Sequence, residues 1–137
     1  MFKRMFTGFH GWLYRLSNGR IGGGMREAKI LVLTTTGRKS GKPRSFPLIY
    51  LEHGDAKAVM ASNSGGASHP AWYFNLVANP DVSYQIRSDT TAATATTADA
   101  GTKAQLWPDF VSVYPTYEKY TEKTDRDFPV VLLTPRS

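Results

Sequence analysis

The sequence predicts an α+β fold in which mainly antiparallel strands form a closed or nearly closed barrel, with helices covering the gaps. Two observations support this prediction. Six short runs rich in β-branched and aromatic residues are separated by turn residues, which is the pattern of strands. With 137 residues and no cysteine, the chain is long enough for a domain whose core needs no disulfide.

The expected strands span residues 29–36, 45–51, 57–62, 82–87, 91–98 and 129–133. Between the third and fourth strands, a short helix is expected to begin at Pro70, whose missing N–H is harmless in a first turn. This helix should stop at Asn79-Pro80.

A second helical region is expected between the fifth and sixth strands. Thr102 and Gln105 have the spacing of a capping box, which predicts its start. Pro108 and Pro115 follow within the same region, so we expect a kink or two short helices.

The first 24 residues form a predicted arm and glycine hinge, followed by a barrel domain over residues 25–137. Seven apolar residues of the arm recur at three- and four-residue steps and fill an arc of roughly 120° on a helix. Two interpretations remain open, an amphipathic helix on an anionic membrane surface or a helix packed on the core. The apolar residues are Phe2, Met5, Phe6, Phe9, Trp12, Leu13 and Leu16.

The segment GRKSGKPR, residues 37–44, carries four cations and no acid between two strand-like runs. Four neighbouring positive charges repel one another, which predicts a turn that binds a phosphate or carboxylate. On charge spacing alone, a solvated hairpin tip is the alternative. Residues 1–29 are also basic while the rest of the chain is mildly acidic, so a general nucleic-acid binder is not expected.

Several classes of site are excluded by the residues present. The absence of cysteine removes thiol nucleophiles and thiolate metal sites, and the scattered His10, His53 and His69 predict no metal centre. The glycine spacing of the basic turn does not fit a P-loop, and no Rossmann glycine motif occurs. Neither a membrane-spanning apolar run nor a secretory signal is recognisable, so a cytoplasmic protein is expected, with peripheral membrane contact through the arm as the open alternative.

Three motifs resemble those of one known family. They are TTGRKSGKPR at residues 35–44, ASNSGGASHPAWYFNLVANP at 61–80 and YPTYEKY at 114–120. Together they resemble the deazaflavin-dependent nitroreductases, also described as coenzyme F420-dependent quinone reductases, over about residues 25–134. The resemblance implies a split β-barrel like that of the FMN-binding oxidoreductases, and a cofactor with a phosphate and an oligoglutamate tail.

The resemblance also implies the cofactor-binding residues. Those placed on the phosphate and tail are Arg38, Lys39, Ser40, Gly41 and Arg44; those beside the deazaflavin ring are Ser62, Asn63 and Ser64; those lining the groove are Pro47, Ile49, Pro70, Ala71, Trp72 and Asn75. Many relatives carry a lysine where this chain has Asn63, so one contact with the phosphate or tail should be weaker or replaced. The alternative for Trp72 and the 70–78 segment is simple barrel packing.

Three tyrosines are candidates for the electron acceptor. Tyr114, Tyr117 and Tyr120 recur at three-residue steps, which on one helix spreads them over about 120° of one side. We expect them to form an aromatic substrate lid, with Tyr120, Tyr117 and Ser62 as candidate catalytic hydrogen-bond donors. The alternative is that the tyrosines pack the helix onto the barrel with their hydroxyls in solvent.

The sequence is therefore interpreted as an oxidoreductase that transfers a hydride from reduced F420 to a quinone, nitroaromatic or activated enone. One alternative is an FMN-binding split-barrel enzyme. Another is a non-catalytic binding module for nucleic acid or anionic lipid. The sequence does not indicate an oligomeric state.

Overall fold

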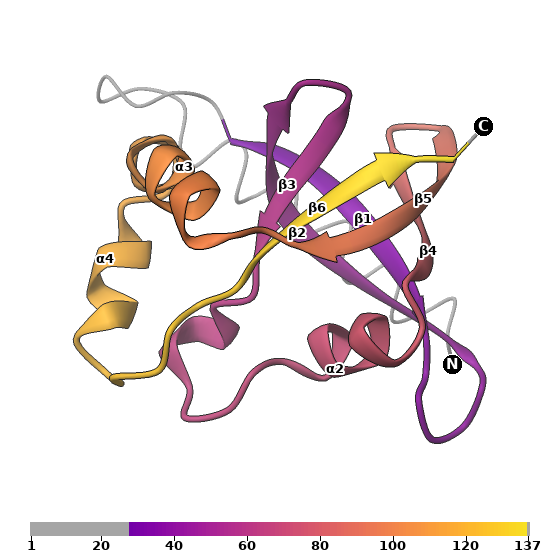
Figure 1. Cartoon of the computed structure of the whole chain (residues 1–137), viewed down its shortest axis with the longest axis horizontal. Coiled ribbons are helices and arrows are strands. Elements are labelled where there is room, and N and C mark those ends of the chain that lie inside the picture. The colour runs from indigo at the N-terminus through magenta and orange to yellow at the C-terminus, as the bar shows by residue number, and fades with distance from the viewer. Residues whose placement is uncertain (1–27, 137) are drawn as a thin grey trace.

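Six strands form a closed antiparallel barrel within residues 28–136, which are the residues that the computed structural model describes (Figure 1). Neighbours around the barrel follow the order β1-β2-β3-β6-β5-β4, and β4 pairs with β1 to close it. The strands are β1 (Lys29–Thr36), β2 (Pro43–His53), β3 (Ala56–Met60), β4 (Asp81–Ile86), β5 (Asp89–Thr97) and β6 (Val130–Pro135).

The predicted barrel is confirmed. Strand β1 has the predicted bounds, and the other strands begin and end within two residues of their predicted positions. The predicted arm, its amphipathic helix and the glycine hinge lie outside the described residues. The domain boundary at residues 24 and 25 therefore stays a prediction.

Strands β2, β3 and β6 are apolar on both faces because each face packs against a different layer. In β6, Val131 and Leu133 point into the barrel, whereas Val130 and Leu132 point outward. This alternation follows from the two-residue period of a strand. It explains why these strands read as continuous apolar runs in the sequence.

Helices α3 (Ala100–Val113) and α4 (Thr116–Thr121) cover the outer face of these three strands (Figure 1). They bury Leu106, Phe110, Val113 and Tyr117 there. Burying side chains of this size contributes roughly 1.5–3 kcal/mol each.

Two details of this helical region correct the sequence prediction. Asp99, rather than the predicted pair Thr102 and Gln105, is the N-cap of α3, and its side chain accepts from the Thr102 N–H at 2.8 Å. Pro108 lies inside α3 and does not end it, because it is exposed and removes only one intrahelical hydrogen bond. The predicted division into two helices is confirmed, but it falls at Tyr114 and Pro115.

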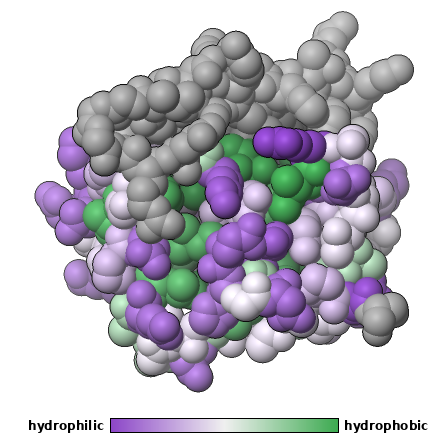
Figure 2. Space-filling view, turned by 90° about the horizontal axis from the view of Figure 1, so that it is seen from above, coloured by the Kyte–Doolittle hydropathy of each residue, from purple (hydrophilic) through white to green (hydrophobic). Residues whose placement is uncertain are grey.

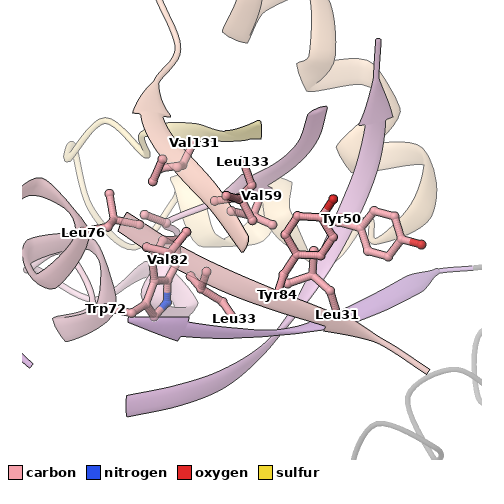
Figure 3. Close-up of a cluster of buried hydrophobic side chains, with 13 residues drawn as sticks. Leu31, Leu33, Tyr50, Val59, Trp72, Leu76, Val82, Tyr84, Val131 and Leu133 are labelled. Carbon is pink, nitrogen blue, oxygen red and sulfur yellow. The ribbon is translucent and has the colours of Figure 1, made fainter. Parts of the chain in front are cut away.

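Helix α2 (Ala71–Ala78) plugs one end of the barrel, with Pro70 at its N-cap. Trp72 and Leu76 project from it toward Leu33 and Val82, while Tyr84 lies at the other end of the cluster (Figure 3). Between β3 and α2, a 3-10 turn, η1 (Asn63–Gly65), was not predicted. The left-handed backbone of η1 gives no periodic pattern of apolar residues, so the sequence offered no basis for predicting it.

The outside of the barrel is mixed in polarity. On the face seen in Figure 2, hydrophobic side chains gather in a band flanked by hydrophilic ones. No helix within residues 28–136 is long and apolar enough to cross a membrane.

Gly65 provides a test of how η1 is packed against α4. Its φ is +77°, and a Cβ there would lie 2.9 Å from the Tyr120 carbonyl oxygen. We expect Gly65→Ala to lose about 1–2 kcal/mol from the left-handed backbone, and a further 1–3 kcal/mol, roughly, from overpacking. Urea denaturation measures the sum of these two losses as a decrease in the free energy of unfolding.

Gly54→Ala is the matched control, because Gly54 also has a positive φ of +62° but has open space around it. Gly54→Ala should therefore lose only the free energy that the left-handed backbone costs an alanine. Equal losses of stability in the two variants would mean that α4 yields freely, and that η1 does not fix its position.

Candidate active site

A groove of about 520 Å³ opens between the β1–β2 turn, the start of β2 and the start of α2. Cations line one end, and aromatic and apolar side chains line the other. The lining residues are Gly37, Arg38, Lys39, Ser40, Arg44, Ser45, Phe46, Asn63, Pro70, Ala71, Trp72 and Asn75. We call this the outer groove.

The cationic end is formed by the β1–β2 turn. The Gly37 N–H donates to the Lys42 carbonyl at 2.8 Å, and the Gly41 N–H donates back to Gly37 at 2.8 Å. Gly41 has a φ of +73°, which favours glycine. Gly37 is closely surrounded, because a Cβ there would lie 2.8 Å from the Ser40 Oγ and 3.2 Å from the Lys42 carbonyl oxygen. The turn is therefore tight, and it brings its backbone close to the groove.

The cations of the turn have no acidic partner in the part of the chain that the structure describes. Arg38, Lys39 and Arg44 line the groove, and the Arg44 Nη2 donates only a long bond, 3.3 Å, to Ser40. The α2 N-terminus, at Ala71 and Trp72, adds its partial positive charge to the same groove. This combination suits a ligand that carries several anionic oxygens.

Asn75 joins the turn to the barrel and to α2. Its Oδ1 accepts from the backbone N–H of Arg38 at 3.1 Å and from the Arg38 Nη1 at 3.2 Å. Its Nδ2 donates to the Thr35 Oγ1 at 3.1 Å. Arg38 also lies over the Phe74 ring, 5.2 Å from its centroid. Asn75 and Phe74 therefore fix the direction in which Arg38 points.

A second, smaller cavity of about 160 Å³ adjoins the first, and we call it the inner cavity. Four residues line both: Phe46, Asn63, Pro70 and Trp72. The other residues of the inner cavity are Pro47, Leu48, Ile49, Met60, Ser62, Ser64, Tyr114, Tyr117 and Tyr120. A ligand in the outer groove and a small apolar molecule in the inner cavity would share this wall.

The three predicted tyrosines meet at the inner cavity, but not on one helix. Tyr114 is the C-cap of α3, whereas Tyr117 and Tyr120 belong to α4. Pro115 begins a new helix between them, which corrects the single-helix arrangement expected from their spacing. Their rings pack edge to face, with centroids 5.1 Å apart for Tyr114 and Tyr117 and 6.2 Å for Tyr117 and Tyr120.

The hydroxyls of these tyrosines differ in their partners. Tyr114 and Tyr120 bond to each other at 3.2 Å. Tyr117 is a buried residue whose hydroxyl has no hydrogen-bond partner among the described residues, and since no side-chain polar atom there is both buried and unsatisfied, this hydroxyl is accessible. It therefore borders the cavity. Burial, reinforced by Tyr114 and Tyr120, raises the pKa of Tyr117 well above its usual value, so it remains a protonated donor.

The η1 turn brings the Ser62 hydroxyl to the same cavity. Ser62 is buried, and its hydroxyl likewise has no partner within residues 28–136. The two residues after it, Asn63 and Ser64, have φ values of 49° and 54°. Such left-handed residues cost about 1–2 kcal/mol each, so the surrounding structure must hold them in place.

The structure brings almost all the predicted site residues to these two cavities. Gly41 is the exception, since it lines neither and acts only through the shape of the turn. Sequence reasoning missed Gly37, Ser45, Phe46, Leu48 and Met60. Phe46 had a usable signal in the sequence, because it is a large aromatic residue only two positions after Arg44, the last cation of the turn.

Comparison with known proteins assigns the chain to a family. The model of the F420H(2)-dependent quinone reductase family matches residues 7–135. A Mycobacterium tuberculosis protein that bears this family name is 39% identical over 118 residues, covering 85% of this chain and 99% of its own. An F420H(2)-dependent quinone reductase of the same species is 38% identical over 131 residues, covering 93% of this chain and 88% of its own.

A solved structure described as an F420-H2 dependent reductase superposes with a TM-score of 0.70 and 39% identity. The match covers 82% of this chain and 99% of that one. With a matching barrel, a family model that spans most of its length and relatives matched over most of theirs, this chain belongs to the F420H(2)-dependent quinone reductase family and is an oxidoreductase.

Proposed function

We propose that this chain binds coenzyme F420 in the outer groove and passes a hydride to a quinone held in the inner cavity. The observation that carries the proposal is the shared wall of the two cavities, with the cations of the turn in the outer groove and the hydroxyls of Tyr117 and Ser62 in the inner cavity. Family membership supplies the reaction class.

The residues present fit this cofactor. The cations and the Ser40 hydroxyl suit a phosphate and an oligoglutamate tail, and Gly37 allows the backbone to approach them closely. Phe46, Pro70 and Trp72 offer apolar contacts to a planar ring at the shared wall. Asn63 and Ser64 can hydrogen-bond its polar edge.

When bound, the reduced cofactor supplies the hydride, so the protein needs no acid–base pair for that step. The protein must hold the acceptor in line and exclude water from it. A quinone that receives a hydride gains negative charge on one oxygen. The protonated hydroxyls of Tyr117 and Ser62 can donate hydrogen bonds to that oxygen and stabilise the charge as it forms.

An FMN-dependent reaction and a purely non-catalytic binding role are both less well supported. The family and its relatives are F420H(2)-dependent by name, so nothing in the comparisons favours FMN. Membership of an enzyme family sets the non-catalytic binding module aside. Nitroaromatics and activated enones remain candidate acceptors, because the inner cavity combines apolar and aromatic side chains with hydroxyls, a lining that suits small planar acceptors.

The first prediction tests the cationic turn. Arg44→Ala and Lys39→Ala should each weaken F420 binding roughly tenfold or more, since each removes a charged hydrogen-bond partner of an anion. Fluorescence titration of the folded variants measures the Kd. Lys42→Ala is the matched control, because Lys42 belongs to the same turn but does not line the groove.

A tail-less deazaflavin separates the subsites, because its affinity should depend much less on Lys39 and Arg44. If all three variants weaken binding equally, the turn acts only as a diffuse positive charge. If none does, it is the solvated hairpin tip that charge spacing alone allowed.

The second prediction concerns the acceptor. Tyr117→Phe should lower kcat with a water-soluble quinone by about 10- to 100-fold. This loss is no larger than the usual effect of removing one oxyanion-hole donor. F420 affinity should stay nearly unchanged. Tyr120→Phe should have a smaller effect, because its hydroxyl is already bonded to Tyr114.

Tyr50→Phe is the control, since Tyr50 is a buried tyrosine that lines neither cavity. Steady-state kinetics at saturating cofactor check these expectations. A Tyr117→Phe enzyme with full turnover but poor F420 binding would show that the tyrosine serves the cofactor instead.

We further propose that residues 1–18 dock on an anionic membrane, where lipid-soluble quinones lie; the amphipathic sequence pattern supports this. Each basic residue should add about 1 kcal/mol at such a surface, screened beyond roughly 10 Å by salt. The protein should float with anionic but not neutral liposomes, and high salt or joint Lys3→Gln, Arg4→Gln and Arg15→Gln substitution should reduce flotation. A protein that ignores anionic liposomes at low salt contradicts the proposal.

A further inference from the structure

Arg126 lies between α4 and β6 and lines neither cavity, yet its guanidinium holds the loop that carries Ser62. Its Nε donates to the Gly66 carbonyl at 2.9 Å, and its Nη1 to the Ala61 carbonyl at 3.1 Å. Its Nη2 donates to the Ser62 carbonyl at 2.5 Å. One side chain thus joins both ends of the loop 61–66.

The fourth contact of Arg126 defines the state of His69. The Arg126 Nη1 lies 2.6 Å from the His69 Nδ1. A guanidinium nitrogen can only donate, so Nδ1 must present its lone pair, and the imidazole must be neutral. The Phe128 ring lies against the guanidinium, 4.7 Å from its carbon Cζ. The guanidinium is therefore fixed on its edge and on one face.

The loop held in this way has an unusual backbone. Asn63, Ser64 and Gly65 are three successive residues with φ values of 49°, 54° and 77°. Only two backbone bonds support the turn from within, from the N–H groups of Gly65 and Gly66. A run of left-handed residues persists only where neighbouring groups restrain it. Arg126 is one such group, because it hydrogen-bonds to the carbonyls on both sides of this run.

We propose that Arg126 is a positioning residue that, with neutral His69 as its fourth acceptor, holds the loop 61–66 so that Ser62 and Asn63 border the two cavities. This inference rests on the proposed function for its kinetic consequences. The positioning itself does not, since it concerns a loop in the protein alone.

Protonation of His69 should release the loop. The titratable and charged groups that face His69 are Arg126, Asp127 and Tyr73. Burial and then Arg126 lower the pKa of His69 from its usual 6.5, while Asp127 opposes this. The folded protein thus prefers the neutral ring, so stability should fall as pH decreases from 6.5 toward the lowered pKa.

The first experiment measures the loop without any cofactor. In Arg126→Lys and Arg126→Gln, hydrogen exchange at the Gly65 and Gly66 amides should be at least about tenfold faster, with the strand amides unchanged. Lysine keeps the positive charge but lacks the planar set of N–H donors of a guanidinium, so Arg126→Lys should not protect these amides. Arg136→Gln, a half-exposed arginine 3.8 Å from Asp81, is the matched control.

The kinetic arm uses the same variants with saturating F420 and a water-soluble quinone. The Arg126 variants should lose roughly tenfold or more in kcat, because a displaced Ser62 no longer faces the acceptor. Wild-type protein that neither binds F420 nor reduces quinones would defeat the proposed function. Unchanged amide exchange in both Arg126 variants would defeat the positioning role, whatever the activity.

The second experiment uses His69→Gln, whose amide oxygen can accept from Arg126 but does not titrate. Loop exchange, corrected for intrinsic rates, should loosen between pH 7 and pH 5 in the wild type and stay constant in this variant. By NMR, the His69 pKa should rise in Arg126→Gln as the neighbouring cation is removed. A wild-type His69 pKa at or above its usual value would overturn the neutral-acceptor arrangement.

Discussion

The barrel is closed by a ladder of only three residue pairs between β1 and β4, and the arrangement of both cavities depends on that closure. Strands β1 and β2 pair over eight positions and carry the cationic turn at their end. Because β4 must return beside β1, the segment before it has to cross the barrel end as α2. The helix therefore arrives next to the turn, and Asn75 bonds to Thr35 and Arg38 there.

The two cavities show how few elements are needed to bring distant motifs together. The basic turn, the segment from η1 to α2, and the tyrosines lie in three separate parts of the sequence. Closure brings the first two together, and packing of α4 against η1 adds the tyrosines, with Gly65 next to the Tyr120 backbone. The hydroxyls of the buried residues Tyr117 and Ser62 are left where a ligand could reach them, which agrees with a site arranged around an acceptor rather than a filled core.

Features determined by local chemistry could be predicted from the sequence, whereas those determined by a partner elsewhere in the chain could not. The apolar, β-branched run Lys29–Thr36 predicted β1 correctly, and the family motifs identified most of the site residues. Thr102 failed as a capping residue because Asp99 lies three residues before it and accepts its N–H more directly. In the sequence, Arg126 lies between Asp125 and Asp127, a pattern typical of a solvent-exposed ion pair. In the structure it instead donates to backbone carbonyls about sixty residues earlier in the chain.

Strand β5 combines exposure with a composition that favours aggregation. Residues 90–98 contain only Thr and Ala, with no charge or proline to discourage pairing with another chain. In the finished barrel both of its edges are occupied, by β4 and by β6. Since β6 follows β5 by some thirty residues, one edge stays open during synthesis until β6 has been made. The protein's resistance to aggregation therefore depends on the last of the barrel strands to be synthesised.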